Sequence, residues 1–383
     1  MLKVMLSVGE ASGDLHGACV AEALKRIQPD VKMFGMGGCQ MRDAGVEIIY
    51  DIADLGVIGF VEVIRNLPRL FRLRDSLTEV MDRERPDVLL IIDYPDFNIR
   101  LAKAAKKLGI PVVSYIPPSA WAWRRGRAKE VAKTVDRIAA IFPFEADVYQ
   151  EAGANVVFVG NPSLDIVKSS MTKEAAYRHF NADPAKPVVL LMPGSRRQEI
   201  VSLLPVMLAS AEKIREKTPE CQFFLPLAST ISREIMQNMV NGCGVPIRIT
   251  VGNNYDLMSI SDVAIAASGT ATLETSLMGV PTIIVYKLAA LTYFLGKFLV
   301  KIPYFGLPNI IVGRKIVPEL LQDAVNAETI ACEALTILND MVVRKRILDD
   351  LGEVRRKLGE NGAVDRVANV VLEVAMANHG GQQ

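Results

Sequence analysis

The sequence has few of the residues on which metal and thiol chemistry depends. Its 383 residues include three histidines and five cysteines, and no two cysteines form a CxxC pair. A histidine-based zinc site or a Ser–His–Asp triad is therefore not expected. An odd number of scattered cysteines is typical of reduced thiols in a cytosolic protein. We predict no metal site and no cofactor.

An excess of charge and long apolar runs are also lacking. The 44 basic and 43 acidic residues leave a net charge of +1, and no RNA-binding signature is present, so we expect no nucleic-acid partner. The longest uncharged stretch, Leu108–Trp123, has sixteen residues and three prolines, which makes it too short and too broken for a membrane span. The first residues lack the basic and apolar regions of a signal peptide, and we expect none.

Short runs rich in Val, Ile and Leu alternate with amphipathic stretches along most of the chain. This alternation is typical of βαβ units around a parallel sheet whose strands are buried on both faces. It pauses at 160–186 and then resumes, which predicts two consecutive doubly wound α/β domains with a hinge near 161–165. We expect a first domain at 1–165, a second at 166–340 and a helical tail at 341–383.

Residues that directly follow a strand carry the most functional weight, because ligands of open α/β sheets bind at the carboxyl ends of the strands. The strands that the pattern predicts are Lys3–Val8, Val31–Met36, Val88–Ile92, Pro111–Tyr115, Ile138–Phe142, Val156–Val159, Val188–Met192, Gln222–Leu227, Ile247–Val251, Val263–Ala267 and Thr282–Val285. The segments between them are expected to be helices and loops.

The loop GEASGD, residues 9–14, follows the first strand and opens a helix. Its glycines allow a close backbone approach, and a helix N-terminus favours an anion or a hydroxyl-rich group. Two carboxylates in the loop would repel a pyrophosphate, and the loop does not match GxGxxG. Considered alone, this loop is better explained by helix capping through Ser12 or Asp14.

Asp93 follows the very apolar strand 88–92 and opens the segment DYPDFN. A carboxylate beside an apolar strand end can have a raised pKa and act as a general base. The alternative is that Asp93 only orders the turn and that Asp96 or Asn98 caps the next helix. We predict a functional role for Asp93 and a capping role for Asp96.

Two strand-to-helix turns of the second domain combine small residues with charged ones. The first, MPGSR, places backbone amides and Arg196 where a diphosphate could bind. The second, ASGTATLE, adds a carboxylate one turn into the helix, where it could accept both hydroxyls of a ribose. The predicted binding residues are Gly194, Ser195, Arg196, Ser268, Gly269, Thr270 and Glu274.

Two segments combine arginines with apolar and aromatic residues, as a surface that meets an anionic membrane would. For the first, residues 58–74, a core-facing helix with a solvated basic face is about equally supported, and Pro68 would mark its start. The second is the tryptophan–arginine segment 121–127. The predicted membrane-binding residues are Phe60, Ile64, Arg65, Arg69, Leu70, Phe71, Arg72, Trp123, Arg124 and Arg125.

Taken together, the motifs resemble the lipid-A-disaccharide synthase family almost from end to end. The segments that carry this resemblance are, in chain order, SVGEASGDLHGA, LGVIGFVEV, IIDYPDFN, PPSAWAWR, FPFE, FVGNPSLD, MPGSRRQE, AASGTATLE, and LPNIIVGR followed by VPELLQ. Several such motifs in order are far more specific than any one alone. The resemblance implies a GT-B fold, two Rossmann-like domains with the active site between them, at the cytoplasmic face of the Gram-negative inner membrane.

The resemblance also implies a reaction and its site. UDP-2,3-diacylglucosamine and 2,3-diacylglucosamine 1-phosphate would give a β-1′,6-linked disaccharide 1-phosphate and UDP, with inversion. Asp93 matches the family's proposed base, and Glu10 would share that role or hold the acceptor. Arg196 matches the residue that meets the diphosphate. The nucleotide side would add Ser268, Gly269, Thr270, Glu274 and Asn309, and Ser12 and Asn98 complete the substrate-binding set.

No DxD pair flanks a sugar-nucleotide loop, so Arg196 and two helix N-termini would stabilise the leaving diphosphate, and we predict metal-independent catalysis. The family is known for exchanging C-terminal segments between two subunits. The helical tail could do this in a homodimer or cross back onto its own first domain, and the sequence does not separate these alternatives.

Three other functions fit the sequence less well. A sugar-nucleotide 2-epimerase uses the same two-domain fold but needs no acyl-binding surface, so the arginine–aromatic region at 58–74 speaks against it. A non-catalytic nucleotide- or lipid-binding protein would have no use for a carboxylate such as Asp93 at a strand end. A nicotinamide oxidoreductase is weaker still, because no strand is followed by GxGxxG.

Overall fold

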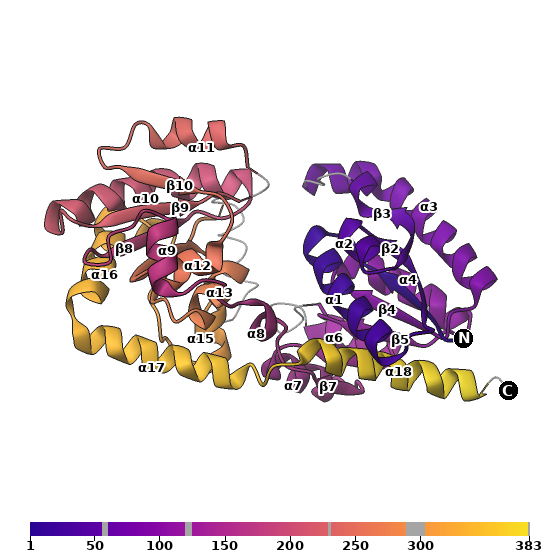
Figure 1. Cartoon of the computed structure of the whole chain (residues 1–383). Coiled ribbons are helices and arrows are strands. Elements are labelled where there is room, and N and C mark those ends of the chain that lie inside the picture. Colours follow the sequence, from indigo (N-terminus) through magenta and orange to yellow (C-terminus); the bar gives the residue numbers. More distant parts are fainter. Residues whose placement is uncertain (56–59, 119–124, 229–230, 289–302, 382–383) are drawn as a thin grey trace. The chain divides into compact units, whose positions relative to one another are not determined.

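The computed structural model describes residues 1–55, 60–118, 125–228, 231–288 and 303–381 (Figure 1). The chain divides into two compact units: Met1–Pro162 with Glu360–Gln383, and Ser163–Gly359. Each unit contains one parallel sheet with helices on its faces, so the predicted doubly wound α/β fold is confirmed for both. None of the helices in the described ranges combines the length and apolar character that a bilayer crossing requires.

The first unit has a seven-stranded sheet in the order β3-β2-β1-β4-β5-β6-β7. Its strands are β1 (Lys3–Ser7), β2 (Lys32–Gly37), β3 (Glu47–Asp51), β4 (Val88–Ile92), β5 (Val112–Tyr115), β6 (Arg137–Ala140) and β7 (Val156–Phe158). Its helices are α1 (Ala11–Ile27), α2 (Cys39–Asp43), α3 (Phe60–Glu84), α4 (Pro95–Lys107), α6 (Arg125–Thr134), α7 (Pro143–Glu151) and α18 (Ala363–Gly381), with a 3-10 turn at Ile52–Leu55.

The second unit has a six-stranded sheet in the order β10-β9-β8-β11-β12-β13. Its strands are β8 (Val188–Met192), β9 (Gln222–Pro226), β10 (Ile247–Thr250), β11 (Val263–Ala267), β12 (Thr282–Tyr286) and β13 (Glu319–Leu321). Its helices are α8 (Ser163–Ile166), α9 (Lys173–His179), α10 (Arg197–Lys217), α11 (Arg233–Val240), α12 (Asn254–Ser259), α13 (Thr270–Leu277), α15 (Leu307–Val312), α16 (Ala327–Asn339) and α17 (Met341–Lys357), with a 3-10 turn at Gln322–Ala324.

Both sheets share one topological feature that places the site. In each, the chain builds outward in one direction and then returns to the middle, so the strand order reverses between β1 and β4 and between β8 and β11. These four strands are almost entirely buried, as expected for parallel strands that helices cover on both faces. The loops at their carboxyl ends part at the reversal, which is where open α/β sheets bind ligands.

The sequence pattern missed two strands, β3 and β13, which both lie at a sheet edge. An edge strand pairs on one side only and keeps solvent-facing residues, so EIIYD and ELL lack the apolar run of a buried strand. The prediction that α3 starts at Pro68 was also wrong, because the helix begins at Phe60 and contains the proline. Pro68 is exposed, and a proline at this position costs the helix one backbone hydrogen bond without ending it.

The C-terminal segment is divided between the two units. Helix α17 packs against α13, α15 and α16, whereas α18 packs against α1 and the strands β4 to β6 (Figure 1). The Arg366 side chain fixes the start of α18 by donating to the Val159 carbonyl at 2.7 Å and to the Glu360 and Asn361 carbonyls. Within this single chain, α18 therefore belongs to the first unit and α17 to the second.

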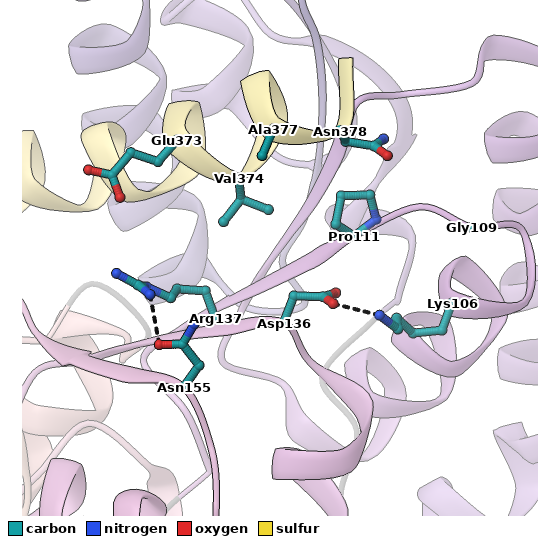
Figure 2. Close-up of a pocket in the computed structure, with 10 residues that line it drawn as sticks. All are labelled: Lys106, Gly109, Pro111, Asp136, Arg137, Asn155, Glu373, Val374, Ala377 and Asn378. Atoms are coloured by element: carbon teal, nitrogen blue, oxygen red, sulfur yellow. Dashed lines mark hydrogen bonds and ion pairs between the residues drawn. The ribbon is translucent and has the colours of Figure 1, made fainter. Parts of the chain in front are cut away.

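A pocket of about 530 Å³ lies beneath α18, at the amino ends of β5, β6 and β7 (Figure 2). Two contacts join residues of its lining: an ion pair of Lys106 with Asp136 at 2.6 Å, and a hydrogen bond from Arg137 to Asn155 at 2.7 Å. None of the predicted site residues lines this pocket. The pocket therefore lies at the amino ends of the strands, whereas the switch point lies at their carboxyl ends. Helix α18 forms one of its walls.

Candidate active site

The switch point of the first unit brings together two of the predicted loops. Glu10 lies at the N-terminal end of α1, just after β1, and Ser12 follows in the first turn of the helix; both side chains are exposed. Asp93 follows β4, which pairs directly with β1. The catalytic pair that the sequence predicted therefore shares one end of the sheet, and the negative charge of Glu10 acts on Asp93.

An unusual backbone turn presents Asp93. Asp93 and Tyr94 both have φ of +48°, a left-handed conformation that costs non-glycine residues roughly 1 kcal/mol or more each. The turn is held by Asn98, whose amide donates to the Asp93 carbonyl at 2.7 Å and to the Ile92 carbonyl at 3.2 Å. The Tyr94 ring lies against Gly9 so closely that a Cβ atom there would overlap it. This firmly held, strained turn keeps the Asp93 carboxylate at the carboxyl end of β4.

The surroundings of Asp93 favour its protonated form. Its side chain reaches solvent, but nearby protein atoms displace part of its hydration shell, and this partial desolvation raises its pKa. A hydrogen bond from the Tyr94 backbone opposes the shift, and the charge of Glu10 adds to it. A carboxylate with a raised pKa is a stronger base than an ordinary surface aspartate, which suits it to removing a proton from a hydroxyl group.

Three predictions for this region need correction. Asn98 is fully buried. Its amide nitrogen donates to the Ser7 and Asp93 carbonyls, and its amide oxygen accepts from the Ser7 hydroxyl at 2.7 Å. The side chain is therefore not available to substrate and instead supports the turn. Asp14 does not cap its own helix; its buried carboxylate accepts from the Gly38, Gln40 and Met41 amides at the start of α2. Asp96 forms an ion pair with Arg127 rather than a cap.

In the second unit, the turn after β8 holds the predicted diphosphate residues. Gly194 has φ of +107°, and a Cβ atom there would overlap the Glu199 carboxylate. That carboxylate accepts from the Ser195 and Arg196 amides, each at 3.3 Å, and pairs with the Arg196 guanidinium at 3.4 Å. Arg196 remains highly exposed. The backbone amides of this turn can therefore bind an anion, and in this structure the carboxylate of Glu199 is the group that they bind.

The neighbouring turn after β11 carries the predicted nucleotide residues. Ser268 donates to the Phe305 carbonyl at 3.2 Å, and Gly269 and Thr270 lie at the N-terminal end of α13. Glu274 follows one turn later and accepts a hydrogen bond from the Tyr255 hydroxyl at 3.0 Å. Burial raises the pKa of Glu274, while the bond from Tyr255 lowers it. Because β8 and β11 are adjacent, both turns lie at the switch point of the second sheet.

Asn309 is not free to bind a nucleotide, which corrects the prediction for the LPN motif. Its side chain is fully buried, with its amide bonded to the Val317 carbonyl and to Glu319, and its oxygen to the Ile316 and Val317 amides. Glu319 in turn accepts from the backbone amides of Phe305 and Gly306. Asn309 therefore fixes the loop that Ser268 contacts.

Only part of the predicted membrane surface can be described. Trp123 and Arg124 lie outside the described residues, as do the side chains of Phe60, Ile64, Arg65 and Arg125. Arg69 donates to the Tyr50 hydroxyl at 3.2 Å, and Arg72 is exposed. Leu70 is partly buried against the core of the first unit, so it is a poor candidate for contact with lipid. Phe71 is 39% exposed between the guanidinium groups of Arg74 and Arg100.

The sequence analysis missed several residues that lie in or beside the two switch points. Glu199 could have been found, since a glutamate three residues after a helix start is a capping signal. Tyr94 and Tyr255 act through folded contacts that no local pattern announces. His16, on α1, packs edge-on against Tyr115 at the end of β5, and its Nδ1 has no hydrogen-bond partner in the described part of the chain. Burial lowers the pKa of His16, which keeps the ring neutral.

Solved structures with the same architecture define the class. The chain superposes over its full length on a putative UDP-N-acetylglucosamine 2-epimerase from Listeria monocytogenes (TM-score 0.66, 13% identity, covering 97% of that chain). A glycosyltransferase from Rickettsia africae matches with a TM-score of 0.60 at 14% identity, covering 97% of this chain and 98% of that one. These likenesses establish the GT-B fold, shared by nucleotide-sugar transferases and epimerases.

Sequence comparison then identifies the family. A family model described as lipid-A-disaccharide synthetase matches residues 4–372. The lipid-A-disaccharide synthase of Geobacter sulfurreducens is 43% identical, with 97% of both chains covered, and that of Nitrosococcus oceani is 41% identical, with 97% of this chain and 96% of that one covered. The chain belongs to the lipid-A-disaccharide synthase family.

Family membership confirms the predicted activity and rejects the epimerase. The protein is a UDP-sugar-dependent glycosyltransferase of lipid A biosynthesis. Its reaction joins the sugar of UDP-2,3-diacylglucosamine to the 6-hydroxyl of 2,3-diacylglucosamine 1-phosphate and releases UDP.

Proposed function

We propose that Asp93 is the general base of this transfer. Its carboxylate would take the proton from the 6-hydroxyl of the acceptor as that oxygen attacks the anomeric carbon of the donor. The new C–O bond forms on the face opposite the breaking bond to UDP, so the α-linked donor gives a β-linked product. The observation that carries this proposal is the strained turn at the β1/β4 switch point, which holds a carboxylate with a raised pKa at the carboxyl ends of the strands, where open α/β sheets bind ligands.

The second unit would bind the UDP portion. The Arg196 guanidinium and the amides of Ser195 and Arg196 are suited to hold the diphosphate, whose negative charge grows as the bond to the sugar breaks. In that case the diphosphate replaces Glu199 on these donors. Glu274 would accept the ribose hydroxyls, beside Ser268, Gly269 and Thr270. Protein groups then stabilise the leaving group, and no metal ion is required.

The reaction can be followed by release of UDP from UDP-2,3-diacylglucosamine. We expect release to depend on 2,3-diacylglucosamine 1-phosphate and to continue at an unchanged rate in EDTA at saturating substrate. Release without the acceptor would contradict the transferase mechanism. Loss of turnover in EDTA, restored by a divalent cation, would overturn the metal-independent mechanism and leave the transfer itself intact.

We also propose that α3 attaches the protein peripherally to the cytoplasmic face of the inner membrane. Phe71 is an exposed aromatic residue with the guanidinium groups of Arg74 and Arg100 at its ring, and the exposed Arg69 and Arg72 lie on the same helix. An aromatic side chain enters the interface between lipid headgroups and acyl chains, while arginines attract anionic phospholipids. Both substrates are lipids, so a surface of this kind would bring the enzyme to them.

Vesicle sedimentation tests this attachment. Replacing Phe60, Ile64 and Phe71 with serine should release the protein from phosphatidylglycerol-containing vesicles, whereas the wild type sediments with them at low salt. Val342→Ser is the matched control, because Val342 is 80% exposed but belongs to α17 of the second unit. Unchanged sedimentation of the triple variant would rule out α3 as the anchor.

A further inference from the structure

Glu274 is held from one side by a single tyrosine. The Tyr255 hydroxyl, on α12, donates to Oε1 of Glu274 at 3.0 Å. In the described part of the chain, this is the only hydrogen bond that Glu274 receives through its side chain. The second carboxylate oxygen, Oε2, therefore keeps its full capacity to accept hydrogen bonds from a ligand.

The tyrosine itself is firmly anchored. Its ring packs against the apolar cluster of the second unit that includes Phe224 and Leu257. The next residue, Asp256, is buried and accepts hydrogen bonds from three successive residues, 169–171, including the Ser170 and Met171 amides at 2.7 Å each. Helix α12 is thus tied to the chain that enters the second unit, and the phenol is a fixed donor rather than a mobile one.

The hydrogen bond also preserves the charge that a ligand would need. Burial raises the pKa of Glu274 and so favours the neutral acid, whereas the Tyr255 hydroxyl donates to the carboxylate and favours the ionised form. Burial and the nearby charge of Glu274 raise the pKa of Tyr255, so the phenol stays protonated and acts as a donor. An ionised carboxylate accepts two hydroxyl groups, which a neutral acid does less well.

We propose that Tyr255 is a positioning residue that orients Glu274 so that Oε2 accepts the vicinal hydroxyls of the ribose of UDP. This inference rests on the proposed function, in which Glu274 faces the nucleotide. It assigns to Tyr255 the preference of the site for a ribonucleotide over a nucleotide that lacks these hydroxyls. Tyr255 does not touch the reacting atoms.

The test compares the affinities of UDP and 2′,3′-dideoxy-UDP by titration calorimetry. Tyr255→Phe keeps the ring and removes the hydroxyl. We expect it to weaken UDP binding about tenfold and dideoxy-UDP binding far less, so that the ratio of the two affinities narrows. In turnover, KM for the donor should rise while kcat changes little. Tyr177→Phe is the matched control, because it removes another partly buried hydroxyl at the same apolar cluster.

Two outcomes separate the inference from the function on which it rests. If Glu274→Gln leaves the ratio unchanged, the nucleotide assignment of Glu274 is wrong and the inference falls with it. If Glu274→Gln collapses the ratio but Tyr255→Phe retains the wild-type value, only the positioning role is overturned. In that second case, an equal loss of affinity for both ligands in Tyr255→Phe would show that its role is purely structural.

Discussion

Asp93→Asn lowers acceptor-dependent UDP release by about 10²- to 10⁴-fold, the usual contribution of a general base. The substitution keeps the size of the side chain and its contacts within the turn, but asparagine cannot take a proton. The affinity for UDP should be unchanged, since the nucleotide residues belong to the second unit. Stopped assays of UDP release, paired with UDP titrations, measure both quantities. A variant with near wild-type release would remove Asp93 from the mechanism.

The pH dependence provides an independent check on the same group. The base must be ionised, so activity falls as the pH falls through the pKa of Asp93, and its raised pKa places this loss above the range of an ordinary aspartate. Glu10→Gln removes a negative charge that contributes to the shift, so the acidic limb of kcat/KM should move to lower pH. An acidic limb that stays in place would mean that Glu10 does not act on Asp93.

Much of the candidate active site could be predicted, because the sequence pattern indicates where the buried strands end. Apolar runs such as VLLII mark a buried strand, and the residue that follows must lie at the carboxyl edge of the sheet. Asp93, Arg196 and Glu274 were all predicted from their places after such strands, and the structure puts each of them at the carboxyl end of its sheet. The strand order, and with it the switch point, required the fold, since the same alternation of strands and helices fits several orders.

Buried polar residues were harder to interpret. Asn98 and Asn309 lie in motifs that suggest ligand contacts, yet both side chains are fully buried and are used by backbone groups. A polar side chain that completes a strained turn and one that binds a substrate look alike in sequence, since both follow strands beside small residues. Only burial and the accounting of hydrogen bonds separate them.

The second large effect concerns α18, which belongs to the first unit although the whole second unit separates it from the rest of that unit in the sequence. Val371→Asp should destabilise the first unit by more than about 4 kcal/mol, because it removes a fully buried apolar side chain and places an unpaired carboxylate in its position. Helix α18 packs on α1 and on β4 to β6, which include the strand that carries Asp93. Urea denaturation followed by the hydrogen-exchange protection of the backbone amides of β1 and β4 measures the stability of this unit.

Met376→Asp is the matched control, because Met376 lies on the same helix and is 52% exposed. It should change the free energy of unfolding by less than about 0.5 kcal/mol. If Val371→Asp were equally mild, α18 would not be part of the core of the first unit. If instead its effect weakened as the protein concentration rose, α18 would be supplied by a second copy of the chain, since exchanged helices bind by mass action. A concentration-independent loss of stability is what a helix that returns to its own first unit requires.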